Sequence, residues 1–240
     1  MSFAARAPRA RHVPAVLAFA LALLAGGTTL GARGASAVVP WTDPSLADSL
    51  SLQSDAINPR VLQLALRAVS CAAAATDAAR PTVLTLIDYS RPSTERRLWV
   101  LDLVTRRVLF EELVAHGKNT GENLAKLFSN APGSLQSSLG LYLTGATYTG
   151  RNGYSLRLLG LEPGVNDRAL ERAIVVHGAD YLERATAERL GRVGRSWGCP
   201  AVPRRVAQAL IDTIKGGSFV FAYYPDERWL SNSRFLGSCR

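Results

Sequence analysis

Residues 172–202 read RAIVVHGADYLERATAERLGRVGRSWGCPAV, and this stretch decides the expected fold of the chain. Its apolar, β-branched start predicts a short buried strand that ends at His177, where Gly178 lets the chain turn at once. A polar, arginine-rich segment of 18 residues then leads to the sequence SWGCP at 196–200. Glycine and proline predict a tight turn there, followed by an amphipathic helix at 203–215 that ends at two glycines.

Cys199 in this turn has the surroundings that a nucleophile needs. A thiol becomes strongly nucleophilic as a thiolate, and a nearby histidine can take its proton and later return it to an amine. Gly198 lets backbone N–H groups approach a reacting carbonyl, where they stabilise its oxyanion. Cys199 and His177 are therefore candidates for nucleophile and base.

Other interpretations fit the same two residues. A single buried cysteine is often a small apolar residue, and a histidine at a strand end is often held in structural hydrogen bonds. A zinc site would need more ligands than one Cys and one His. Neither C-x-x-C nor H-E-x-x-H occurs in the sequence, so we expect no metal.

Strand patterns dominate the chain around this stretch. Runs of β-branched and aromatic residues predict strands at 82–89, 97–103, 108–115, 138–144, 155–159, 173–176 and 218–224. Asn58 and Pro59 predict the start of a helix at 59–75, and residues 116–133 are typical of a long polar loop. These patterns predict one mainly β domain with flanking helices (α+β), built on a mixed, barrel- or sandwich-like sheet.

The first 37 residues have the order of a secretory signal peptide. Basic residues precede a short apolar run, and Ala35-Ser36-Ala37 supplies a cleavage pattern. An uncut membrane anchor is the alternative, although a span needs about 20 apolar residues. We expect a signal peptide at 1–37, an N-terminal arm and helix at 38–79, with 38–58 as linker or wrapped arm, and the main domain at 80–240. No stable membrane span is expected after cleavage.

Charge and cysteine content indicate which partners the protein could bind and how its thiols could pair. Loss of residues 1–37, with four Arg and no acidic residue, lowers the formal net charge from +9 to +5. This mild excess suits an anionic cell-wall polymer, and no basic run with interleaved aromatics indicates nucleic acid. Three cysteines leave at least one thiol free in an oxidising compartment. Cys71 and Cys239 form a disulfide or stay unpaired, and the sequence leaves both options open.

His177-Gly178, the loop, and Ser196-Trp197-Gly198-Cys199 resemble the signature of the L,D-transpeptidase (YkuD-like) catalytic domain. Further stretches resemble one branch of that family, and they are His116–Gly121, Phe128–Asn130, Ser137–Tyr142 and Ser155–Leu158. The resemblance covers about residues 80–225. Trp197 replaces the family's usual second histidine, and Ala201 stands where Asn or Arg is common.

The resemblance implies a sheet of the L,D-transpeptidase type and an exported bacterial enzyme of the periplasm or cell envelope. Cys199 would attack an L,D peptide bond in a peptidoglycan stem peptide, form a thioester and pass it to an amine, without metal or organic cofactor. Two alternatives remain. Water as acceptor would make an L,D-carboxypeptidase or cross-link hydrolase, and a decayed site would make a non-catalytic wall-binding protein.

Roles for five more residues complete the expected site. Ser196 would hold the turn. Arg195 would bind a substrate carboxylate, whose shape its guanidinium matches, or would be a solvated charge of the loop. His116 lies in a Gly/Asn loop at a strand end, where binding residues are frequent, so it is expected to line the cleft. Asn130 and Tyr142 are expected to contact substrate or to brace loops. Tyr181, Trp99 and Trp229 are expected in the core.

Overall fold

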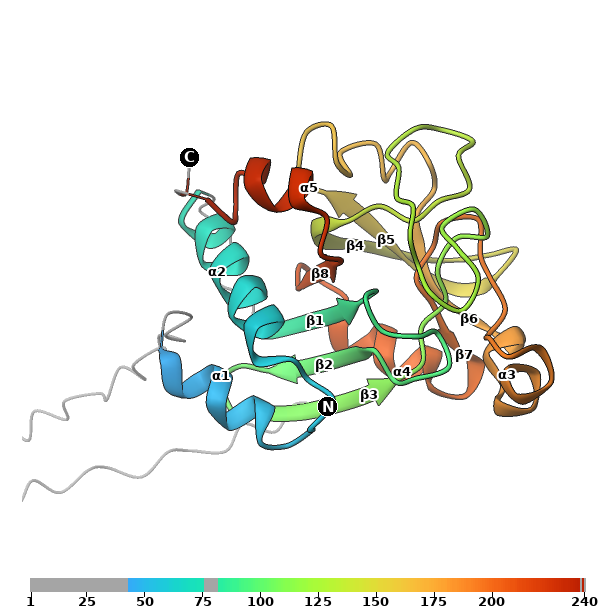
Figure 1. Cartoon of the computed structure of the whole chain (residues 1–240), viewed down its shortest axis with the longest axis horizontal. Coiled ribbons are helices and arrows are strands. Elements are labelled where there is room, and N and C mark those ends of the chain that lie inside the picture. Colours follow the sequence, from blue (N-terminus) through green and yellow to red (C-terminus); the bar gives the residue numbers. More distant parts are fainter. Residues whose placement is uncertain (1–42, 76–81, 238, 240) are drawn as a thin grey trace, which may run out of the picture. The chain divides into compact units, whose positions relative to one another are not determined.

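A computed structural model describes residues 43–75, 82–237 and 239 of the chain (Figure 1). The predicted signal peptide at 1–37 lies outside the described residues. Within them, no helix has the length and apolar character that a membrane crossing requires.

One mixed sheet forms the body of the described chain, in the order β3-β2-β1-β8-β4-β5-β6-β7. The strands are β1 (Val83–Asp88), β2 (Leu98–Asp102), β3 (Arg107–Glu112), β4 (Gly140–Gly150), β5 (Gly153–Gly160), β6 (Val175–Ala179), β7 (Ala201–Pro203) and β8 (Phe219–Tyr223). β8 pairs in parallel with β1 and antiparallel with β4, so it joins two groups of strands. The sheet is strongly curved and nearly closed, as the predicted barrel-like fold requires (Figure 1).

Helices flank this sheet. They are α1 (Pro44–Ser51), α2 (Pro59–Ala75), α3 (Arg184–Leu190), α4 (Arg204–Ile214) and α5 (Glu227–Asn232), with a 3-10 turn η1 (Asp180–Leu182). α2 begins where the sequence predicts, because Asn58 Oδ1 accepts the backbone N–H of Arg60 at 2.9 Å and caps the first turn. α4 buries Leu210, Ile211 and Ile214 on one face and packs against β6, so it supports the strand that carries His177.

The segment expected as a linker or wrapped arm contains helix α1. Asp43 caps its first turn, since its side chain accepts the N–H of Ser45 at 2.9 Å. Leu46 and Leu50 are fully buried in the same hydrophobic core as the strands. The helix therefore forms because two leucines four residues apart find an apolar partner surface, which a short pattern alone does not reveal. The domain boundary at residue 80 stays a prediction.

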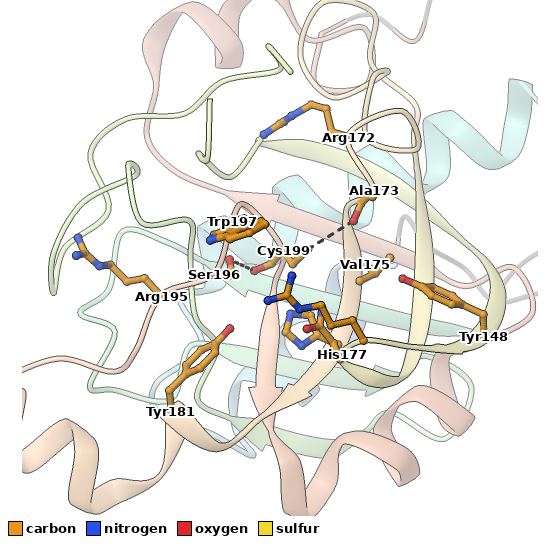
Figure 2. Close-up of a pocket in the computed structure, with 12 residues that line it drawn as sticks. Tyr148, Arg172, Ala173, Val175, His177, Tyr181, Arg195, Ser196, Trp197 and Cys199 are labelled. Atoms are coloured by element: carbon orange, nitrogen blue, oxygen red, sulfur yellow. Dashed lines mark hydrogen bonds between the residues drawn. The ribbon is translucent and has the colours of Figure 1, made fainter. Parts of the chain in front are cut away.

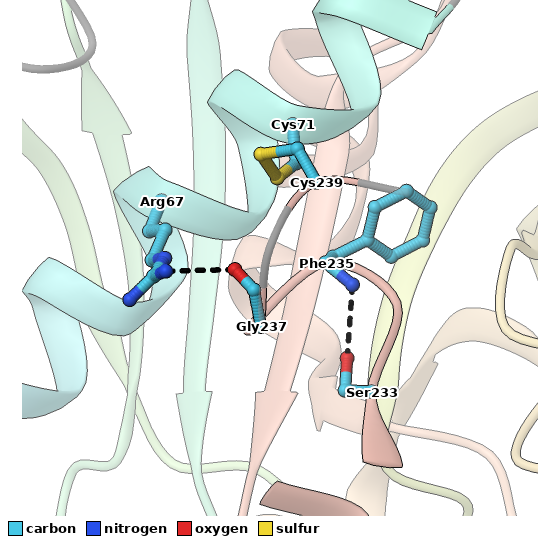
Figure 3. Close-up of a disulfide and its surroundings, with 6 residues drawn as sticks. All are labelled: Arg67, Cys71, Ser233, Phe235, Gly237 and Cys239. Carbon is cyan, nitrogen blue, oxygen red and sulfur yellow. Dashed lines mark hydrogen bonds between the residues drawn. A yellow bond between two sulfur atoms is a disulfide. The ribbon is translucent and has the colours of Figure 1, made fainter. Parts of the chain in front are cut away.

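A disulfide joins Cys71 in α2 to Cys239, with 5.2 Å between the Cα atoms (Figure 3). The guanidinium of Arg67, one turn earlier in α2, donates to the carbonyl oxygen of Gly237 at 2.7 Å. Both contacts tie the segment after α5 to α2. Cys199 is the free cysteine of the described residues.

Loss of this disulfide should destabilise the fold and leave the site intact. Replacement of Cys71 and Cys239 by alanine is expected to lower the free energy of unfolding by about 2–5 kcal/mol, because a long loop of the unfolded chain is no longer closed. Urea unfolding of the variant and of the reduced and oxidised wild type measures this. An unchanged midpoint on reduction of the wild type would show that the cross-link contributes nothing.

Candidate active site

The two residues singled out from the sequence meet at the end of the sheet. β6 and β7 pair in parallel with His177 opposite Ala201, and Cys199 lies two residues before Ala201. Since side chains alternate along extended chain, Cys199 and His177 emerge on the same face.

Both side chains line one open cavity of about 410 Å³ (Figure 2). Its lining residues are Tyr148, Arg151, Asn152, Arg172, Ala173, Val175, His177, Tyr181, Arg195, Ser196, Trp197 and Cys199. The hydroxyl groups of Tyr148 and Tyr181 point into it from opposite sides of Cys199 (Figure 2). The strand and the turn predicted from residues 172–202 therefore form one site. The predicted strand end was wrong, because β6 continues through Gly178 to Ala179 and pairs there with β7 instead of turning at Gly178.

Ser196 closes the nucleophile turn on itself. Its hydroxyl donates to the carbonyl of Cys199 at 2.6 Å and accepts the N–H of Gly198 at 3.1 Å. Gly198 has φ +125°, and a Cβ there would lie 2.8 Å from the carbonyl oxygen of Gln136, so only glycine fits. Ser196 thus holds the turn as predicted.

The same hydrogen bonds change the expected oxyanion donors. The N–H of Gly198 is held by Ser196 and points back into the turn. The N–H of Cys199 has no hydrogen-bond partner among the described residues. The N–H of Gly198 is thus occupied, and the N–H of Cys199 is available to a developing oxyanion in this conformation.

The loop before β4 forms the support beneath this turn. The carbonyl of His116 accepts the N–H of Ser196 at 2.9 Å, and the N–H of Lys118 donates to the carbonyl of Ser196 at 2.8 Å. Ser137 Oγ donates to the carbonyl of Gly198 at 3.0 Å. The long polar loop of the sequence is therefore ordered by contacts with the nucleophile turn.

His177 is oriented by its own neighbour. Its Nδ1 lies 3.1 Å from the carbonyl oxygen of Gly178, and a carbonyl only accepts, so Nδ1 carries the proton. Nε2 is then the unprotonated nitrogen, ready to accept a proton. Burial lowers the pKa of His177, which keeps the ring neutral at pH 7. From the sequence, Asp180 or a backbone carbonyl could orient this ring; the structure shows the carbonyl of Gly178 in that place, and Asp180 binds the guanidinium of Arg204 at 2.9 Å.

Cys199 rests as a neutral thiol. Burial raises the pKa of its thiol, although the N–H of Val175 and the charge of Arg172 act in the opposite direction. The thiol lies 3.7 Å from the carbonyl oxygen of Ala173 as a weak donor. Proton transfer to His177 is therefore the step that would create the nucleophile.

Arg172 is a member of the site that the sequence reasoning did not single out. Its guanidinium donates to the carbonyls of Ser129 and Gln136 at 2.7 and 2.5 Å, and to the hydroxyl groups of Ser138 and Ser134 at 2.6 and 3.2 Å. It thereby fixes the loop that lies under Gly198, while its charge acts on Cys199. The sequence signal is an arginine directly before the predicted strand.

His116, expected to line the cleft, does not line this cavity. It is 1% exposed, and its ring lies between the guanidinium of Arg97, 2.8 Å from Nδ1, and the carbonyl of Gly121, 3.2 Å from Nε2. Arginine only donates, so Nδ1 accepts and Nε2 carries the proton. Burial and the charge of Arg97 lower the pKa of His116 to about 4. Its ring braces the loop.

Acid should therefore destabilise the fold through His116. Its pKa is about 4 when folded and about 6.5 when unfolded, so the unfolded chain binds more protons as pH falls between these values. His116 therefore makes its full contribution to stability above pH 6.5. Protonation of the unfolded chain lowers the free energy of unfolding by about 3 kcal/mol by pH 4. His116→Gln, which keeps an acceptor for Arg97, should flatten the slope of unfolding free energy against pH. Parallel slopes in urea titrations would contradict this.

Of the remaining predicted binding residues, one lines the cavity and two lie outside it. Asn130 binds the carboxylate of Asp167 at 2.7 Å, and the buried hydroxyl of Tyr142 donates to the carbonyl of Ser138 at 3.0 Å. Neither residue lines the cavity. Arg195 does, but its guanidinium is bound to Glu122 at 2.7 Å and points away from Cys199 (Figure 2).

Two parts of the cavity were not expected from the sequence. Tyr181, expected in the core, is half-buried and lines the cavity, whereas Trp99 and Trp229 are buried as predicted. Arg151 and Asn152 form the tip of the β4–β5 hairpin, which also reaches the cavity. Asn152-Gly153 is a common hairpin-turn sequence that could have indicated this tip. The described residues hold no cluster of His, Cys, Asp and Glu that could bind a metal ion.

The buried thiol of Cys199 and the oriented, neutral imidazole of His177 thus line the same cavity. The sequence model of the L,D-transpeptidase catalytic domain matches residues 53–223, and the chain belongs to this family. No curated protein matches it significantly.

Among solved structures, the chain is similar to an L,D-transpeptidase from Mycobacterium smegmatis, with 15% identity and a TM-score of 0.37 over 60% of this chain and 59% of that one. The match thus spans less than two thirds of the mycobacterial chain. It is also similar to an L,D-transpeptidase from Stackebrandtia nassauensis, with 12% identity and a TM-score of 0.37 over 75% of this chain and 90% of that one.

Proposed function

We propose that the protein is a peptidoglycan L,D-transpeptidase that transfers a stem peptide through a thioester on Cys199. The donor is a stem peptide whose L,D amide bond is cleaved. The acceptor is the side-chain amine of a diamino acid on a second stem. The family membership supports the reaction class.

His177 and Cys199 carry the first half of this reaction. His177 Nε2 takes the thiol proton, and the sulfur attacks the carbonyl carbon of the L,D bond. The N–H of Cys199 donates to the oxyanion. As the carbon–nitrogen bond breaks, His177 returns the proton to the leaving D-amino acid, and a carbon–sulfur bond remains.

The second half uses the same groups in reverse order. The acceptor amine attacks the thioester and loses a proton to His177, which returns it to the departing sulfur. The product is a cross-linked peptide and a regenerated thiol, without a cofactor. Tyr148 and Tyr181, which point into the cavity beside Cys199, are placed to contact the peptide.

The observation that carries this proposal is the shared cavity of Cys199 and His177, with the imidazole oriented by Gly178. The test is incubation with purified muropeptides, followed by mass analysis of the protein and of the products. A thioester on Cys199 and a cross-linked dimer are expected. A shortened monomer instead of the dimer would mean that water is the acceptor. If no adduct forms on Cys199, the protein would be the non-catalytic wall-binding alternative. A carbapenem is a second probe of the same thiol.

We also propose that the protein acts outside the cytoplasm, in the periplasm or cell envelope. The disulfide between Cys71 and Cys239 supports this, because such bonds persist in oxidising compartments. N-terminal sequencing of protein from the envelope should find a start near Val38. An intact Met1 would contradict cleavage of the predicted signal peptide.

A further inference from the structure

A tryptophan and an arginine from separate elements meet at the mouth of the cavity. Trp197 belongs to the nucleophile turn, and Arg151 belongs to the tip of the β4–β5 hairpin. The guanidinium carbon of Arg151 lies 5.9 Å from the centre of the indole ring, within cation–π distance. Trp197 is 66% exposed, which is unusual for an aromatic residue two positions from a nucleophile.

We propose that Arg151, held on Trp197, binds the terminal carboxylate of the donor stem peptide. This inference rests on the proposed function, because the carboxylate belongs to the D-amino acid that leaves from the cleaved bond. Trp197 is then a positioning residue, and Arg151 sets the specificity for donors that end one residue after that bond.

The other two arginines of the cavity are already occupied. Arg172 donates to two carbonyls and two hydroxyl groups of the loop beneath the turn. Arg195 is bound to Glu122 and to the carbonyl of Lys118. Arg151 has no hydrogen bond or ion pair with any described residue, and its guanidinium lies over the face of Trp197. It is therefore the guanidinium that a ligand can use.

The cation–π attraction to the indole prepares this guanidinium for a carboxylate. The guanidinium is held near the ring face, and its N–H groups have no partner among the described residues, so they remain free to donate. A fork held in this way matches the two oxygens of a carboxylate, and less freedom is lost on binding than for an unsupported arginine. Trp197 stands in place of a histidine in the related signature, and an imidazole offers a smaller surface for stacking.

The charge of the cavity favours the same ligand. No Asp or Glu is among the described residues that line it, whereas three arginines are. A carboxylate next to the scissile amide therefore meets positive charge and no repelling partner. The leaving amino acid carries its carboxylate one Cα beyond the scissile nitrogen, and Trp197 is close to Cys199 in the same turn. A donor lengthened or amidated at that end would lose the contact.

The experiment compares two donor peptides that differ only at the C-terminus, one as the free acid and one as the amide. Single-turnover acylation of Cys199, followed by intact mass, gives kcat/KM for each. The wild type should prefer the free acid, and Arg151→Gln should lower its kcat/KM about 10- to 100-fold while changing that of the amide less than about 3-fold. Arg96→Gln removes an exposed arginine outside the cavity and should keep the wild-type preference.

Two further variants test the stacking. Arg151→Lys keeps the charge without the flat fork and should retain part of the preference. Trp197→Ala should reduce the preference for the free acid over the amide. Equal losses for both donors in Arg151→Gln, or no loss, would overturn the inference.

Failure of the proposed function would give a different experimental result. If the wild type forms a thioester with neither donor while a neutral reagent alkylates Cys199, the transpeptidase proposal falls. Calorimetric binding of the two donors to Cys199→Ala then decides the carboxylate site independently of turnover. Tighter binding of the free acid than of the amide, with the difference lost in Arg151→Gln, would support the carboxylate site. Equal binding of the acid and the amide would overturn it.

Discussion

Replacement of Cys199 by alanine should abolish turnover of muropeptides while the protein stays folded. The reaction forms a bond to the sulfur, so removal of the sulfur removes the pathway rather than slowing it. Cys199 is 9% exposed at the rim of the core, and loss of one sulfur atom leaves the hydrogen bonds of the Ser196 turn in place. Product analysis by mass and a melting curve are the measurements.

Cys199→Ser is the matched variant, since it keeps a nucleophilic atom of similar size. Its hydroxyl is a far weaker nucleophile at neutral pH, so turnover should also vanish, and the melting temperature should stay near that of the wild type. Residual turnover at the wild-type rate in the alanine variant would end the cysteine-enzyme hypothesis.

Replacement of His177 by alanine should lower the acylation rate of Cys199 by at least two decades. Burial holds the thiol neutral, so a base has to take its proton as the carbon–sulfur bond forms. General-base assistance contributes about 10²- to 10⁴-fold. His177→Gln should be equally slow, because an amide cannot accept and return a proton at neutral pH. Single-turnover acylation followed by mass is the measurement.

His116→Gln is the control for this prediction, because it replaces a histidine that lies outside the cavity. The structure places His116 outside the cavity, between Arg97 and Gly121, so its replacement should change the acylation rate less than about 10-fold at neutral pH. If the His116 variant lost acylation and the His177 variant kept it, the assignment of the base would be wrong.

The sequence predicted those parts of the fold that depend on neighbouring residues. The Asn58 cap and the apolar face of 59–75 gave α2, and alternating or β-branched runs gave seven of the strands. The limits were wrong for two of them, because β4 continues past residue 144 to Gly150 and β6 continues past residue 176 to Ala179. The elements α1, α3, β7 and α5 were missed because six to eight helical residues, or three strand residues, hold too little of a repeating pattern. Strand order depends on pairing between distant segments, which no local pattern encodes.

The site likewise has parts that neighbouring residues determine and parts that depend on residues far apart in the sequence. The turn at Ser196–Cys199 was predictable because glycine and serine act within a few residues of each other. The brace at His116 was not, because its partner Arg97 lies 19 residues away and is fully buried, where burial lowers its pKa to about 10 and leaves it charged. A histidine in a Gly/Asn loop therefore looked like a binding residue. Arg151 was missed because the tip of the β4–β5 hairpin and the nucleophile turn, which both line the cavity, are far apart in the sequence.

The central place of β8 governs when this molecule can fold during synthesis. β8 is the last strand to leave the ribosome, yet it is the strand through which β1–β3 and β4–β7 become one sheet within the described chain. A nascent chain that ends before Phe219 holds two strand groups whose inner edges are open to wrong partners. Pairing between segments so far apart is slow, because chain entropy is lost before contacts form. The complete sheet therefore requires the chain up to Tyr223, and a chain truncated before Phe219 should be prone to aggregation.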